Sequence, residues 1–184
     1  MSDGPGAWVA LAAVAVLLVF WMLGAYNRLV GLRGAIGAAW RKVDDALAVR
    51  GAALAALVTA LRVPLAGEGA ALDALVTAQA HVSAAADALR ANPVLGGSAV
   101  AAVRAEAGMG AATARVLALV EQQPVLRDDP AVAAPAATLR ETAPRLVFAR
   151  QVFNGAVAAY NDAARQFPTR LLTRLYGFGT AGRL

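Results

Sequence analysis

Apolar residues recur every three or four positions over long stretches of the chain, which is the spacing of one face of an α-helix. The first stripe follows a continuous apolar run at residues 7–24 and ends where Pro64 and Gly67 interrupt the pattern. Its members are Leu29, Leu32, Ile36, Trp40, Val43, Leu47, Leu54, Leu57 and Leu61. Because proline and glycine end helices, the pattern predicts one unbroken helix from the apolar run to about Arg62.

Two shorter stripes predict a second and a third helix. The second stripe ends before Asn92 and Pro93. It comprises Leu72, Leu75, Gln79, Val82, Ala86 and Leu89. For the third helix, Ser98 is the expected N-cap and Pro124 the expected end. Its expected inward-facing residues are Val100, Val103, Gly110, Leu117 and Val120.

A fourth helix is predicted from large residues that recur every seven positions, with alanines between them, as in a coiled-coil seam. The large residues are Leu139, Leu146, Phe153, Tyr160 and Phe167, and the alanines are Ala149, Ala156 and Ala163. Pro144 predicts either a kink or a late helix start. Since the connections are short, neighbouring helices should be antiparallel. The predicted fold is all-α, an up-down four-helix bundle.

The apolar run is long enough to cross a bilayer, and Trp8, Trp21 and Tyr26 lie at its edges, where amphipathic rings prefer to be. A cleaved signal peptide is the alternative, but its charged n-region is missing. The positive-inside rule places the N-terminus outside and the bundle in the cytoplasm, because basic residues follow the run. The predicted organisation is a short tail at 1–6, a transmembrane helix at 7–25, the bundle at 26–166 and a basic amphipathic segment at 167–184.

An even number of helices brings the end of the fourth helix back to the membrane. The segment there combines arginines with apolar residues, as in helices that lie on anionic headgroups. These residues are Arg165, Arg170, Arg174, Leu171, Leu175 and Phe178. The alternative is that the same apolar residues cap the base of the bundle, and the two readings are compatible.

Two polar pairs, Tyr26-Asn27 and Tyr160-Asn161, should both lie at the membrane-proximal base. A buried asparagine penalises a misaligned neighbour, so a network that fixes helix register is favoured over a partner site. Arg50 stands where the apolar stripe would place leucine, and a buried guanidinium needs a carboxylate partner. Counting along the helices predicts an interhelical ion pair with Glu121 or Glu141.

Composition narrows the function classes. Hydrophobic residues make up 59% of the chain, the formal charge is +5, and cysteine is absent, which excludes disulfides and thiolate sites. The arginines are spread along the helices, so nucleic acid is not an expected partner. His81, the single histidine, lacks the glutamate three residues earlier that a di-iron bundle needs. The sequence therefore predicts no catalytic residues, no metal site and no cofactor.

Several motifs give the chain a family resemblance. They are Tyr26-Asn27-Arg28-Leu29-Val30, Phe148-Ala149-Arg150-Gln151, Phe153-Asn154, Tyr160-Asn161, Phe167-Pro168 and Leu175-Tyr176-Gly177-Phe178. Together they resemble the LemA family. The family's Asp-Leu-Ile-Pro-Asn-Leu-Val segment is replaced by an alanine-rich stretch at residues 51–58, so the chain resembles a divergent member. The resemblance implies a membrane-anchored helical bundle with a scaffolding role.

The leading hypothesis is a non-enzymatic, single-pass membrane scaffold that presents its bundle to a membrane or envelope protein. Its expected partners are the lipid bilayer, such a protein, and a second copy of the chain as a further candidate. The alternative is a lipid-organising or membrane-remodelling protein that uses its basic C-terminal segment.

Overall fold

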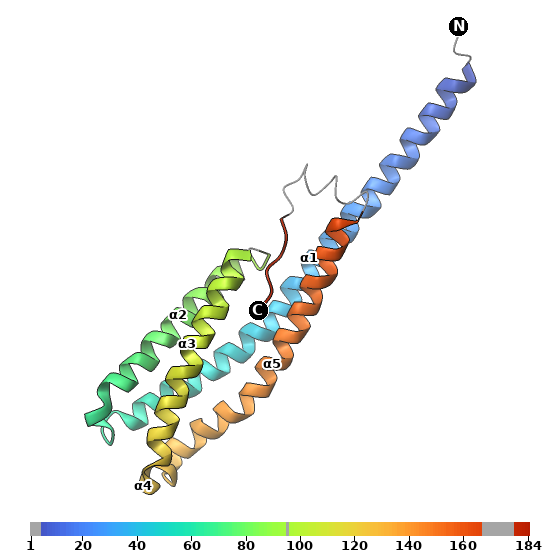
Figure 1. Ribbon diagram of the computed structural model, residues 1–184. Helices are drawn as coiled ribbons and strands as arrows, with labels where there is room; N and C mark the ends of the chain where they lie inside the picture. The colour runs from blue at the N-terminus through green and yellow to red at the C-terminus, as the bar shows by residue number, and fades with distance from the viewer. Residues whose placement is uncertain (1–4, 95, 167–178) are drawn as a thin grey trace.

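The computed structural model describes residues 5–94, 96–166 and 179–184. Within these ranges every regular element is helical, which confirms the predicted all-α fold class. The elements are α1 (Pro5–Leu61), the 3-10 turn η1 (Ala66–Glu68), α2 (Gly69–Ala91), α3 (Gly96–Glu121), α4 (Pro124–Arg127) and α5 (Pro130–Arg165). Consecutive long helices run in opposite directions, which is compatible with the predicted up-down bundle (Figure 1).

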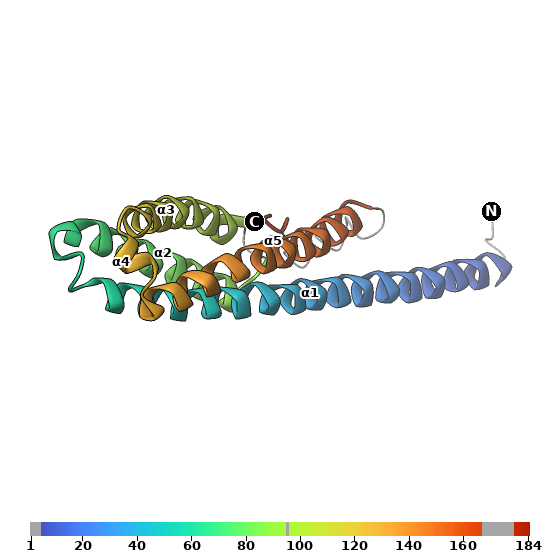
Figure 2. The same ribbon diagram turned by 90° about the horizontal axis from the view of Figure 1, so that it is seen from below.

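The four long helices form two antiparallel pairs. α1 packs mainly along α5, and α2 packs mainly along α3 (Figures 1 and 2). α1 extends well beyond the other helices toward the N-terminus. The two pairs meet over the second half of α1, where the buried residues lie.

α1 is one continuous helix of 57 residues, which at 1.5 Å per residue is about 85 Å long. It ends at Leu61, as predicted, because the chain then reaches Pro64, which has no backbone N–H for a further turn. Its N-terminal part is long and apolar enough to cross a membrane, and none of that window is buried in the protein. The side chains of Trp8 and Phe20 are 66% and 69% exposed.

α5 begins earlier than the pattern predicted. Asp129 caps its first turn by accepting a hydrogen bond from the N–H of Ala131 at 2.9 Å, with Pro130 in the first helical position. The helix then continues through Pro135 and Pro144 to Arg165. A late start at Pro144 is therefore wrong.

The inward face of α3 differs from the predicted one. Its buried residues are Ala99, Ala102, Met109, Val116 and Val120. Most of these lie one position before a predicted residue, and Val100 and Val103 are 55% and 48% exposed. The helix begins at Gly96, so Ser98 lies inside it and not at its cap. Because alanine is smaller than valine, neighbouring segments of the protein can approach the buried face of α3 closely.

Two hydrophobic clusters fill the space between the helix pairs. The distal cluster joins the loop end of α1 to α2, α3 and α4, with Leu57 and Leu61 fully buried. The proximal cluster lies nearer the apolar end of α1 and contains Trp40 and Phe153. Their rings meet edge to face, with centroids 6.0 Å apart.

The C-terminal end of α5 lies beside α1 just after the apolar segment. The guanidinium of Arg28 donates a hydrogen bond to the side-chain oxygen of Gln166 at 3.3 Å. The fourth long helix therefore returns to the side of the bundle from which the apolar segment of α1 extends.

Replacing Phe153 with alanine should lower the free energy of unfolding by about 3–5 kcal/mol, because the ring is completely buried against Trp40. The matched control is Phe148→Ala on the same helix, where the ring is 62% exposed and the expected loss is below about 0.5 kcal/mol. Urea unfolding of the detergent-solubilised chain, followed by tryptophan fluorescence, measures both. Equal losses would show that α5 is rotated from the arrangement described.

Candidate functional site

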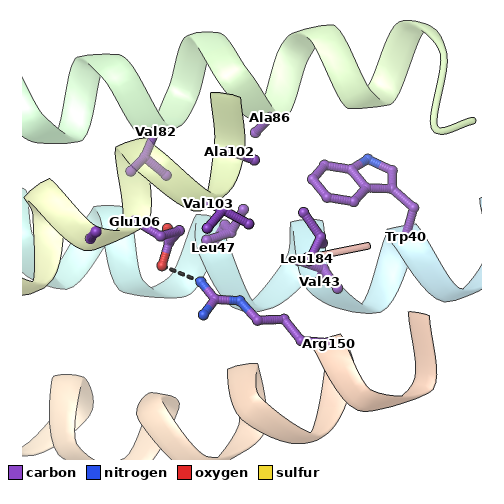
Figure 3. Close-up of a pocket in the computed structure, with 11 residues that line it drawn as sticks. Trp40, Val43, Leu47, Val82, Ala86, Ala102, Val103, Glu106, Arg150 and Leu184 are labelled. Carbon is purple, nitrogen blue, oxygen red and sulfur yellow. Dashed lines mark hydrogen bonds and ion pairs between the residues drawn. The ribbon is translucent and has the colours of Figure 1, made fainter. Parts of the chain in front are cut away.

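A three-residue charge cluster joins the two helix pairs at the middle of the bundle. Glu106 of α3 accepts hydrogen bonds from Arg50 of α1 and from Arg150 of α5. The Arg50 Nη1 to Glu106 Oε2 distance is 2.8 Å, and Figure 3 shows Arg150 reaching Glu106 from the opposite helix. The side chains of Arg50 and Glu106 are 15% and 16% exposed. One carboxylate therefore links three helices.

The charges in this cluster favour the ionised form of Glu106. Burial raises the pKa of the carboxyl group, but the hydrogen bonds and positive charges of Arg50 and Arg150 outweigh that effect. The net result is a pKa below the ordinary glutamate value. Since two guanidinium groups meet one carboxylate, the cluster carries a net positive charge.

An apolar cavity of about 290 Å³ lies beside the cluster (Figure 3). Arg150 and Glu106 are at one end, and Trp40 and Leu184 line the other part. Most of the remaining lining comes from Val43, Leu47, Val82, Ala86, Ala102, Val103 and Ala107. Among the described residues, the buried indole nitrogen of Trp40 has no hydrogen-bond partner. The site therefore combines an unfilled apolar volume with polar groups at its edges.

Residues 179–184, called the tail below, lie against α5 and are held there by side-chain amides. Asn154 donates from Nδ2 to the carbonyl oxygen of Leu184 at 2.7 Å and accepts from the Leu184 N–H at 2.8 Å. Asn161 forms the same pair of bonds with Ala181, at 3.0 and 2.9 Å. The Tyr160 hydroxyl also donates to the carbonyl oxygen of Gly179 at 3.2 Å.

The spacing of the two asparagines matches an extended chain. Seven residues of helix rise about 10.5 Å, and three residues of extended chain span about 10 Å. Asn161 and Asn154 can therefore hold Ala181 and Leu184 at the same time, with the tail antiparallel to α5. Within the described parts of the chain, both asparagines bind backbone atoms only.

The other side of the tail lies against the start of α3. A side chain at Gly182 would place its Cβ 2.8 Å from the Cα of Gly96 and 2.7 Å from the Cβ of Ala99. Glycine is therefore required at this position. Ala181 is buried, and its methyl group belongs to the proximal hydrophobic cluster. The tail thus lies in a groove between α3 and α5.

The polar network that was predicted between the Tyr26-Asn27 and Tyr160-Asn161 pairs has different partners in the structure. Tyr160 and Asn161 hydrogen-bond to the tail, whereas the network was expected to run to Tyr26 and Asn27. Tyr26 and Asn27 are exposed on α1. Burial raises the pKa of Tyr160, and the positive charge of Arg33 lowers it to a smaller extent. Of the predicted network residues, Asn161 binds the backbone of the tail, and Asn154, which forms the matching pair of bonds, was not predicted to take part.

The predicted ion pair of Arg50 with Glu121 or Glu141 is wrong. Arg50 pairs with Glu106, whereas Glu121 pairs with Arg140 at 3.2 Å on the surface. Glu141 is exposed on α5. The error is one of level along the bundle, because Arg50 lies eleven residues before the end of α1 at Leu61, whereas Glu121 is the last residue of α3.

The remaining predicted site residues are candidates for membrane contact, and only some of them fall within the described ranges. Trp8 and Trp21 are exposed on the apolar part of α1, and Arg165 is exposed at the end of α5. His81 is exposed on α2, off the apolar face. The other candidates for membrane contact, Arg170, Leu171, Arg174, Leu175 and Phe178, lie outside the described residues.

Comparison with known proteins adds one finding. The sequence model of the LemA family matches residues 39–183, which is most of the chain and includes the charge cluster and nearly all of the tail. No curated protein matches the chain.

Replacing Glu106 with glutamine should lower the free energy of unfolding at pH 7 by about 3 kcal/mol, because two arginines lose their partly buried counter-ion. The pKa of Glu106 is lower in the folded state, so its contribution is complete above the unfolded value near 4.3. That contribution is lost as the pH falls through the folded pKa. Urea unfolding of both proteins between pH 3 and 7 should show the curves converging at low pH.

Glu141→Gln is the matched control, because this acid is exposed on α5. It should change stability by less than about 0.5 kcal/mol at every pH. A Glu106→Gln protein as stable as the original at pH 7 would contradict the assigned role of the cluster.

Proposed function

Because the chain belongs to the LemA family, we propose that it is a non-enzymatic scaffold, anchored in a membrane by α1, that presents its helical bundle to a membrane or envelope partner. The continuity of α1 carries this proposal. One unbroken helix supplies both the exposed apolar segment and core residues as far as Leu61. A helix without a break holds the bundle at a fixed distance and angle from the membrane.

The exposure of the apolar segment supports the anchor. Trp8, Leu17 and Phe20 are each more than three-fifths exposed, and such a surface is unfavourable in water. A bilayer removes this cost, because its hydrocarbon core spans about 30 Å and thus about 20 helical residues. The basic residues that follow the segment favour an outside N-terminus and a cytoplasmic bundle.

The cavity beside the charge cluster is the surface best suited to a partner. Val103 of α3 lines it and is half exposed, as is Val100 one turn earlier, although their hydrophobicity predicted a core position. Exposed apolar side chains around an apolar depression are typical of protein-binding surfaces. The cluster itself supports a non-enzymatic role, since Glu106 is held as a carboxylate by two arginines and is poorly suited to accept a proton.

One observation favours the alternative, a lipid-organising role. The hydrogen bond between Arg28 and Gln166 supports a position of the end of α5 directly below the proposed membrane span. Arg165 is exposed at that end, where a cation could meet anionic headgroups.

Single cysteines should report the topology cleanly, because the native chain contains none. A membrane-impermeant maleimide added to intact cells should label Ser2→Cys. Thr77→Cys, on an exposed position of α2, should react only after permeabilisation. The reverse pattern would overturn the orientation. A mature chain that begins after residue 25 would overturn the anchor.

A photo-crosslinking residue at Val103 should join the chain to a membrane or envelope protein in living cells. The matched control is the same residue at Val76 of α2, because the two valines are 48% and 44% exposed. We expect at least a tenfold stronger adduct from position 103, since an adduct requires direct contact. Mass spectrometry of the adducts identifies what is bound.

A third probe at Gln166 separates the two functions. Lipid adducts from position 166, together with no protein adduct from position 103, would favour the lipid-organising role. Equal protein adducts from positions 103 and 76 would show that the cavity face is not a specific binding surface.

A further inference from the structure

The tail is bound as a peptide ligand would be bound. Four of its five hydrogen bonds with α5 come from Asn154 and Asn161, and all of them involve backbone atoms of the tail. Recognition through the main chain is the mode used when an extended peptide adds to a protein surface. In this case side-chain amides on a helix take the place of a strand edge.

Side chains on the tail add a sequence preference. Position 182 accepts only glycine because of Gly96 and Ala99, and position 181 buries a methyl group. Leu184 borders the cavity beside Trp40, whereas Arg183 is exposed and carries no constraint. The groove thus selects a small residue, then glycine, then any residue, then an apolar residue.

The tail does not fill the space available to it. The cavity next to Leu184 still has a volume of about 290 Å³, whereas permanent core segments pack to near-crystalline density. Val103 and Ala107, which line this cavity from α3, are exposed at the same time. A groove with unused apolar volume and an open rim can take a longer or bulkier segment than the tail.

We propose that the groove between α3 and α5 binds an extended peptide segment of a partner protein, with the pattern small–Gly–any–apolar, and that the tail is its intramolecular competitor. This inference rests on the proposed scaffold function and names its binding site. A tethered segment acts at an effective concentration in the millimolar range, so the tail suppresses weak binders. A partner segment that uses the remaining cavity volume displaces it.

The test measures binding of a fluorescent peptide with the tail sequence GTAGRL to the purified full chain in detergent. In the variant Gly182→Leu the tail cannot occupy the groove, because even a Cβ at this position is too close to Gly96. This variant should bind the peptide at least tenfold more tightly than the native chain, as measured by fluorescence anisotropy. A peptide with leucine in place of its own glycine should not bind.

The matched control adds Asn154→Ala and Asn161→Ala to the Gly182→Leu chain. Loss of the four amide bonds should abolish peptide binding, while thermal unfolding followed by circular dichroism shows that the helices remain folded. If Gly182→Leu itself unfolds the chain, deletion of residues 179–184 gives a second route to an empty groove.

Three results would overturn the inference. One is a folded Gly182→Leu chain that does not bind the peptide, and another is binding that survives loss of both asparagines. The third is a native dimer that dissociates when the tail is deleted, because this would assign the groove to the tail of a second copy. The measurement uses purified protein, so it can fail while the cellular crosslinks succeed, and the reverse is also true.

Discussion

The partly buried carboxylate of Glu106 is the contact on which the rest of the structure depends. A charge that is taken out of water requires opposite charges in good geometry, and Arg50 and Arg150 supply them from two other helices. The pairing fixes the rotation of α3 about its axis, because removing Glu106 from its two arginines would leave three charges unpaired. With α3 held in this way, Gly96 and Ala99 face the space beside α5. The groove, its tail and the cavity all follow from that rotation.

The helices could be predicted from the sequence where large apolar residues and prolines mark them, but the register of α3 could not. Pro64 ends α1 because it lacks the N–H that another turn needs, and its stripe is buried as the spacing predicts. In α3, alanines form the buried face, while Val100 and Val103 are exposed. A prediction that places the most hydrophobic side chains inward therefore selects a face of α3 that is shifted by one residue from the buried one. Glu106 lies three residues after Val103 and seven after Ala99, so it borders both faces, and a pattern of apolar residues does not mark a glutamate there as part of the core.

Part of the tail-binding site on α5 could be predicted from the sequence, but the segment that it binds could not. Asn161 was predicted to belong to a polar network, whereas Asn154, seven residues earlier and thus on the same face of α5, was not singled out for such a role. Their bonds go to a short extended segment, which has no periodicity and few apolar residues to mark it as bound. Hydrogen bonds to backbone atoms leave no trace in the sequence of the segment that supplies them. Gly182 was the one available signal, and a glycine near a terminus is normally read as a flexible residue.

The energetics of the tail explain how it can be both ordered and replaceable. Five hydrogen bonds hold it, and each contributes about 1 kcal/mol net. Burial of Ala181 and partial burial of Leu184 together add roughly 1–3 kcal/mol. Ordering six backbone residues costs at least about 6 kcal/mol, so the tail keeps a net stabilisation of no more than about 2 kcal/mol. Because Asn154 and Asn161 lie at the edge of the core, water can satisfy their amides when the tail leaves. Because the tail is held so weakly, a ligand can displace it if contacts in the unfilled cavity make the binding free energy of that ligand slightly more favourable.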